Sequence, residues 1–258
     1  MSYFTFEDHN LVGADTGSIT RTDVYQKFLN LHDNLRDKLR CQDYDLHGHP
    51  QKARALSTVS TTATAEPNQT LSLAYFRPYE QARMVESQMG LEINPGETGI
   101  EPQRHPVIEL RLAPDYFAIE LVVSPNAWWD QINFISKIDL QRHRETLRRT
   151  LYRLDADYRF GFWGGENLSD MHLTIWQLLH GRVLDEWMDT FADSQDWLRL
   201  GVWYEPESPQ LSADYIIHEA ATRIGELYKL YDFMLWTSNN DYHQFYQKRD
   251  KYARRMYA

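Results

Sequence analysis

Two five-residue segments of the chain share the order arginine, apolar residue, glycine, apolar residue, tryptophan: RFGFW at 159–163 and RLGVW at 199–203. If each segment is a strand, alternate side chains point the same way, so its arginine, glycine and tryptophan lie on one face of a sheet. A strand glycine between two large side chains leaves a notch that a ligand or another backbone can approach closely. Arginine can hydrogen-bond to an anion there, and tryptophan can stack on a planar ring. The pattern predicts a ligand-binding site made by Arg159, Trp163, Arg199 and Trp203.

The same pattern also has a structural interpretation. A helix that packs across the notch would explain the glycine, with the tryptophan filling the layer and the arginine extending to solvent. The residues that follow each segment are also related, because Leu168-Ser169-Asp170 comes after the first, and Leu211-Ser212 and then Asp214 come after the second. This similarity indicates a duplicated strand–helix unit.

The segment HPVIELRLAPDYFAIELVV, at 105–123, predicts a β-hairpin with its turn near Pro114-Asp115. Apolar residues alternate with other residues on both sides of that turn, as expected of strands with one buried face. Both apolar sets share a face only if paired positions have opposite parity, and the natural register of this kind pairs Leu112 with Phe117 and Ile108 with Leu121.

The same register puts Glu109 directly opposite Glu120, with Arg111 alongside. Two carboxylates that face each other across a sheet are unfavourable, so a cation should compensate them. Arg111 would give a solvated Glu–Arg–Glu cluster. A divalent metal would instead give a metal-dependent hydrolase or nuclease that uses Glu109 and Glu120, assisted by His105 or Arg111.

Positive charge is concentrated in two segments of an acidic chain. The net charge of −10 argues against a surface that binds nucleic acid all round. Residues 139–153 nevertheless contain five arginines, and residues 248–255 contain five basic residues. A helix at 139–153 would dock through an apolar stripe, and its arginines could contact phosphates or an acidic protein. These arginines are Arg142, Arg144, Arg148, Arg149 and Arg153.

Several familiar signatures are missing from the sequence. The single cysteine, Cys41, excludes an intrachain disulfide and a cysteine-rich zinc site. The sequence contains no Gly-x-Ser-x-Gly motif, no phosphate loop and no dinucleotide fingerprint, so we expect no cofactor and no resident metal. The first residues lack a basic region followed by an apolar run, and no apolar run is as long as a membrane span. We therefore expect a cytoplasmic protein without a membrane partner.

The elements that must position these residues follow from hydrophobic periodicity. The sequence predicts a loose N-terminal arm over 1–20, an irregular segment over 41–70, and no linker that divides the chain. We expect helices at 22–40, at 126–154 with a break near 138–139, at 169–191, at 212–233 and from 241 onward, and strands at 71–76, 158–163 and 197–204 besides the hairpin. This order predicts one α+β domain over 1–258, with a mixed or mainly antiparallel sheet of about five strands covered by helices.

The sequence favours a binding protein over an enzyme. Our leading hypothesis is that the sheet face with Arg159, Trp163, Arg199 and Trp203 holds an anionic or planar ligand or a protein partner. The rival is the metal-dependent hydrolase or nuclease. A third possibility is a structural subunit whose aromatic surface is an oligomer interface, since aromatic residues make up 14% of the chain.

Overall fold

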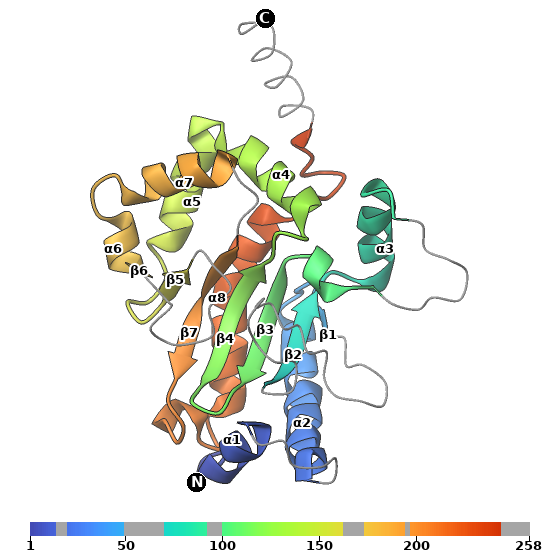
Figure 1. Cartoon of the computed structure of the whole chain (residues 1–258), viewed down its shortest axis with the longest axis vertical. Coiled ribbons are helices and arrows are strands. Elements are labelled where there is room, and N and C mark those ends of the chain that lie inside the picture. The colour runs from blue at the N-terminus through green and yellow to red at the C-terminus, as the bar shows by residue number, and fades with distance from the viewer. Residues whose placement is uncertain (14–19, 49–69, 92–99, 162–172, 194–196, 244–258) are drawn as a thin grey trace, which may run out of the picture.

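The computed structural model describes residues 1–13, 20–48, 70–91, 100–161, 173–193 and 197–243 (Figure 1). The strands in this part of the chain are β1 His47–Gly48, β2 Leu71–Phe76, β3 Val107–Leu112, β4 Phe117–Val123, β5 Arg159–Gly161, β6 Leu173–Thr174 and β7 Leu198–Tyr204. They form one sheet in the order β1-β2-β3-β4-β7-β5-β6, and each neighbouring pair is antiparallel. The α+β class and the antiparallel sheet are thus confirmed. The sheet has seven described strands instead of about five because β1 and β6, of two residues each, are too short to show a period.

The β3–β4 hairpin has the predicted register. Leu112 lies opposite Phe117, and Glu109 lies opposite Glu120. This follows from the two-residue period of a strand, because a slip by one position would turn every apolar side chain away from the core.

The two strands with the repeated pattern lie side by side and run in opposite directions. Arg159 on β5 is opposite Gly201 on β7, and Gly161 on β5 is opposite Arg199 on β7. Each arginine therefore faces the glycine of the other segment. The remainder of the first segment, with Trp163, lies outside the described residues.

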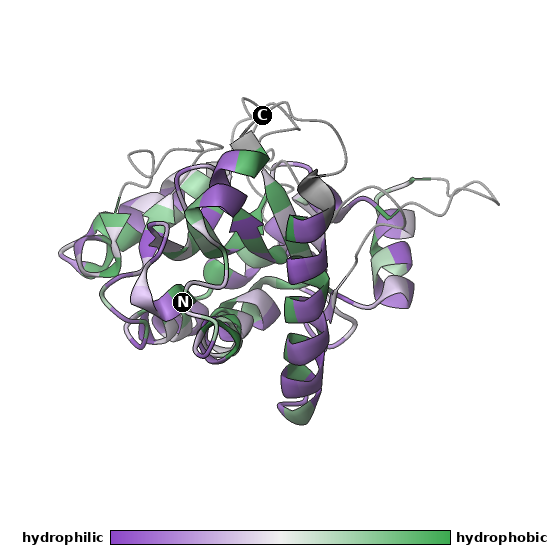
Figure 2. Ribbon diagram, turned by 90° about the horizontal axis from the view of Figure 1, so that it is seen from below, coloured by the Kyte–Doolittle hydropathy of each residue, from purple (hydrophilic) through white to green (hydrophobic). Residues whose placement is uncertain are grey.

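Two long helices cover one face of the sheet (Figure 1). They are α2, Thr20–Cys41, which contacts β1 and β2, and α8, Ile216–Met234, which contacts β3 and β4. Phe28 of α2 lies 6.4 Å from Phe117 of β4, ring centre to ring centre. Hydrophobic residues in Figure 2 gather in the interior, and hydrophilic stretches lie along the outer sides of helices. This apolar layer is the core predicted from the alternating strands.

The remaining described α-helices are α1 Phe6–Gly13, α3 Tyr79–Gln88, α4 Trp128–Ile138, α5 Gln141–Leu151, α6 Ile175–Leu179 and α7 Val183–Asp193. Short 3-10 turns occur at Pro102–Arg104 and Pro209–Leu211. The break between α4 and α5 confirms the one predicted near 138–139. None of the helices in the described part of the chain is long and apolar enough to cross a membrane.

Three predicted elements were wrong in part. The N-terminal arm contains α1, whose residues show no helical period, and α3 begins directly after Pro78, in a stretch where no helix was predicted. The helix expected at 169–191 is divided into β6, α6 and α7, because Gly181 between the two helices has a positive φ of 62° that a continuous helix cannot contain. The basic helix expected from 241 onward lies almost wholly outside the described residues.

Candidate functional site

The sheet face opposite α2 and α8 carries a layer of charged side chains. We call Glu109, Arg111, Glu120 and Arg199 the charged layer. They share a face because Glu120 pairs with Glu109 on one side and with Gly201 on the other. Arg111 lies two positions after Glu109 on β3, and Arg199 lies two positions before Gly201 on β7, so both arginines point to that face as well. Each is at most 1% exposed. The predicted Glu–Arg–Glu cluster exists, but the expectation that it is solvated was wrong, since alternation cannot tell a covered polar face from an open one.

Glu120 is held by both arginines of the charged layer. Arg199 donates from Nε to Oε2 at 3.0 Å and from Nη2 to Oε1 at 2.9 Å, and Arg111 Nη2 lies 2.7 Å from Oε1. Burial by itself would raise the pKa of the Glu120 carboxyl, but Arg111 and Arg199 outweigh it and lower the pKa below its ordinary value. Glu120 is therefore a stable carboxylate.

Glu109 lies in the same layer without such support. Neither arginine of the charged layer hydrogen-bonds to its carboxyl oxygens, and its hydrogen-bonding neighbour is the Ser72 side chain. Burial raises the pKa of Glu109 to about 7, with a smaller opposing effect from Arg111 and a further increase from Glu120. Glu109 can thus gain or lose a proton near neutral pH.

Two stacked rings lie against the charged layer. Tyr116 and Trp203 have ring centres 4.6 Å apart and planes at 10°. The Arg199 guanidinium carbon is 5.2 Å from the Trp203 ring centre, and that of Arg111 is 5.3 Å from the Tyr116 ring centre, so each cation lies over a ring. Trp203 is only partly buried, so it is the point at which the layer approaches the surface.

The structure brings together three of the four residues predicted to bind a ligand. Arg159 is exposed and lies opposite Gly201, so on the shared face Arg159 and Trp203 flank this glycine. Arg199 is buried and bound to Glu120. Trp163 lies outside the described residues.

Gly201 itself has a structural explanation. A Cβ atom added to Gly201 would lie 2.5 Å from the Glu120 Cβ and closer still to the Ile119 carbonyl oxygen. The glycine therefore allows the backbone of β4 to approach β7 closely. A neighbouring backbone was one of the two groups, besides a ligand, that the strand glycine was expected to admit.

Two arginines of the arginine-rich helix α5 form ion pairs with another helix. Arg144 Nη2 donates to Asp189 at 2.9 Å, and Arg148 Nη2 donates to both carboxylate oxygens of Asp185 at 2.9 and 3.0 Å. Both acids belong to α7, so these arginines help to dock α5 on α7. Binding of nucleic acid through Arg142, Arg144, Arg148, Arg149 and Arg153 stays a prediction.

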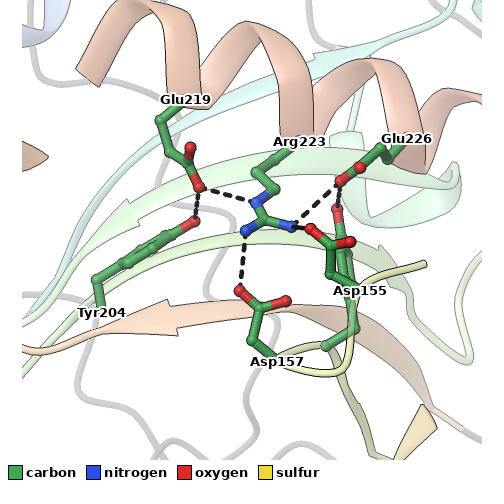
Figure 3. Close-up of polar contacts among 7 residues, drawn as sticks. Asp155, Asp157, Tyr204, Glu219, Arg223 and Glu226 are labelled. Atoms are coloured by element: carbon green, nitrogen blue, oxygen red, sulfur yellow. Dashed lines mark hydrogen bonds and ion pairs between the residues drawn. The ribbon is translucent and has the colours of Figure 1, made fainter. Parts of the chain in front are cut away.

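A second ionic cluster, which sequence reasoning missed, surrounds Arg223 of α8 (Figure 3). Arg223 binds one carboxylate on each side of it in the helix, Glu219 at 2.8 Å and Glu226 at 3.3 Å. It also binds two acids that precede β5, Asp155 at 3.0 Å and Asp157 at 2.8 Å. The cluster thus fastens α8 to the chain that enters β5. The i, i+3 and i, i+4 spacing of the helical residues was the available signal.

The comparisons with known proteins do not name a function. No family model matches the chain, and neither does any curated protein. In the described part of the chain, no three or more His, Cys, Asp and Glu side chains are grouped so that they could hold a metal ion. Function is therefore argued from the geometry of the sheet face.

Proposed function

We propose that the protein is a binding protein that holds a planar, anionic ligand at the edge of the charged layer, where Arg159 and Trp203 flank Gly201. The observation that carries the proposal is the complete burial of four ionisable side chains on one face of the sheet. Removing charges from water is costly, and apolar residues of similar size often stabilise a fold as well or better. The opposite face of the same strands is apolar, so stability alone does not account for the charged layer.

The charge of the proposed ligand follows from which arginine of this sheet face has no carboxylate partner among the described residues. Glu120 neutralises much of the charge of Arg111 and Arg199, and Glu109 adds a negative charge when it is ionised. Arg159 is exposed and forms no ion pair with a described carboxylate, so it is the group that can receive an anion. A guanidinium binds carboxylate or phosphate through a two-pronged hydrogen bond. Trp203 would supply the adjacent ring for stacking.

The test is calorimetric titration of the full chain with nucleoside monophosphates and with aromatic carboxylates. We expect Arg159→Gln to weaken binding by roughly tenfold or more, because a charge-assisted hydrogen bond is lost. Trp203→Phe should weaken it less, because a smaller ring still stacks on Tyr116. Arg153→Gln is the matched control, since Arg153 is also exposed and has no ion pair in the described residues. Equal affinity of the Arg159 and Arg153 variants would refute the proposal.

The metal-dependent hydrolase or nuclease remains an alternative prediction. It requires Glu109 and Glu120 to share a cation, yet Glu120 is already bound by two arginines. Melting temperatures with magnesium, manganese or zinc test it, because a metal that binds the folded state raises the melting temperature. The alternative requires Glu120→Gln to abolish such a rise. A protein partner and an oligomer interface likewise remain predictions.

A further inference from the structure

Helices α5 and α6 lie near the β5–β6 edge of the sheet (Figure 1). Residues of both helices line a separate cavity. Its volume is about 370 Å³, within the range of small-molecule sites. Its lining includes Arg148 and Tyr152 from the α5 side and Ile175, Trp176 and His180 from the α6 side. We call it the α5–α6 pocket.

Trp176 is the unusual member of this lining. Trp176 is 68% exposed, whereas the neighbouring Ile175 is only 4% exposed and belongs to the core. Packing of the fold therefore explains Ile175 but not a tryptophan in contact with water. Tyr152, across the pocket on the chain that leaves α5, is 80% exposed. Two large rings at one cavity form a surface on which a flat molecule can stack.

Local contacts orient Trp176. Thr174 caps α6 by accepting a hydrogen bond from the Gln177 backbone, and the Gln177 side chain bonds back to the Thr174 backbone. The Trp176 ring also stacks on His180, with centres 4.9 Å apart. A ring that is already held in place loses little conformational entropy when it binds a ligand.

The charge of the pocket determines the class of ligand. Arg148 supplies a guanidinium to the lining, and both carboxylate oxygens of Asp185 accept hydrogen bonds from it. Its charge is therefore largely neutralised. Most of the other lining groups are apolar or aromatic, and the His180 ring and the Tyr152 hydroxyl are the remaining polar side-chain groups of the lining.

We propose that the α5–α6 pocket binds a neutral, planar aromatic molecule that stacks on Trp176 beside Tyr152. This site differs from the charged layer in residues and in ligand charge. The two sites are expected to bind independently.

The test uses the full chain labelled with 5-fluorotryptophan, followed by fluorine NMR during titration with indole. The chain has eight tryptophans, and the spectrum of Trp176→Phe identifies the Trp176 signal. We expect this signal to shift saturably with indole, and to shift less with cyclohexanol, which is neutral but not planar. We also expect tighter binding of indole than of indole-3-acetate, because Arg148 is already paired.

Variants then locate the site. Trp176→Ala should weaken indole binding by about tenfold, because both the ring contact and its buried area are lost. The control is Tyr215→Ala, because Tyr215 is 54% exposed and also pairs with a histidine ring, His218, outside the pocket. Arg159→Gln should leave indole binding unchanged. An unmoved Trp176 signal, unchanged affinity in Trp176→Ala, or a preference for indole-3-acetate would each overturn the proposal.

Discussion

Glu109 and Glu120 lie directly opposite each other on β3 and β4, and their surroundings move their pKa values in opposite directions. Both are completely buried. The difference comes from the two arginines, since Arg111 and Arg199 both bind Glu120, and Arg199 hydrogen-bonds to Glu120 but not to Glu109. One sheet face thus holds a carboxyl with a lowered pKa next to one whose pKa is raised to about 7, and each predicts a different response to substitution.

Replacing Glu109 with glutamine should remove a pH dependence of stability. The ordinary pKa of this side chain is 4.5, so between pH 4.5 and about 7 the folded protein keeps a proton that the unfolded chain has lost. The stability from this proton is complete below pH 4.5 and is lost as pH rises through 7. Glutamine is neutral throughout, so Glu109→Gln should be more stable than wild type at pH 8, by on the order of 3 kcal/mol, and similar to it at pH 4.5. Urea unfolding of both proteins at pH 4.5 and pH 8 gives the difference in their free energies of unfolding. If this difference were the same at both pH values, the prediction would be contradicted.

Replacing Glu120 with glutamine should have the opposite effect on stability at pH 8. The change leaves Arg111 and Arg199 buried without the carboxylate that both bind. Breaking a buried ion pair by removing one partner costs about 3–5 kcal/mol. Urea unfolding at pH 8 should therefore order the proteins as Glu109→Gln, wild type and Glu120→Gln from most to least stable. Destabilisation by both variants would show that the two carboxyls are equivalent.

The carboxylate pair could be predicted because it depends only on local pattern. Alternation on two strands joined by a short turn fixes the hairpin register, and with it the positions of Glu109 and Glu120. The contact between Glu120 and Arg199 could not be predicted in this way. It requires β7 to pair with β4 across 79 residues of sequence, and no periodicity specifies which distant strand is the neighbour.

Burial of the charged layer was also beyond sequence reasoning. Charged residues that alternate with apolar ones are typical of a strand with one solvated face, and Glu109, Arg111 and Glu120 have that pattern. The repeated segment was informative in a limited way. It correctly places Arg199, Gly201 and Trp203 on the same face, but it does not show that Arg199 is used internally.

Replacing Arg223 with methionine should destabilise the protein through a different cluster. Methionine retains much of the length of the side chain but leaves Glu219, Glu226, Asp155 and Asp157 close together without their shared cation. The Arg223 side chain is only 10% exposed, while the two aspartates are mostly open to solvent. We therefore expect a loss of about 2 kcal/mol, less than for a fully buried pair.

The salt dependence of this loss identifies its cause. Repulsion among the carboxylates is screened by salt, so the difference between wild type and Arg223→Met should shrink in 0.5 M sodium chloride. Arg149→Met is the control, because Arg149 is exposed and all of its side-chain hydrogen bonds among the described residues lie within α5. It should change stability by less than about 0.5 kcal/mol. A loss in Arg223→Met that is unaffected by salt would indicate lost packing instead.

Replacing Gly201 with alanine should destabilise the sheet at the contact between β4 and β7. The added Cβ would lie 2.5 Å from the Glu120 Cβ, and neither this atom nor the Ile119 carbonyl can move without shifting β4. Overpacking of this kind costs roughly 1–3 kcal/mol, and the shift would also strain the bond between Glu120 and Arg199. Gly225→Ala in α8 is the matched control, because its Cβ would meet the hydroxyl at the end of the Tyr44 side chain, 2.8 Å away, which can rotate aside. Alanine also favours a helix, so this variant should keep its stability. Urea unfolding compares the two, and equal midpoints would mean that β4 and β7 tolerate a side chain at this crossing.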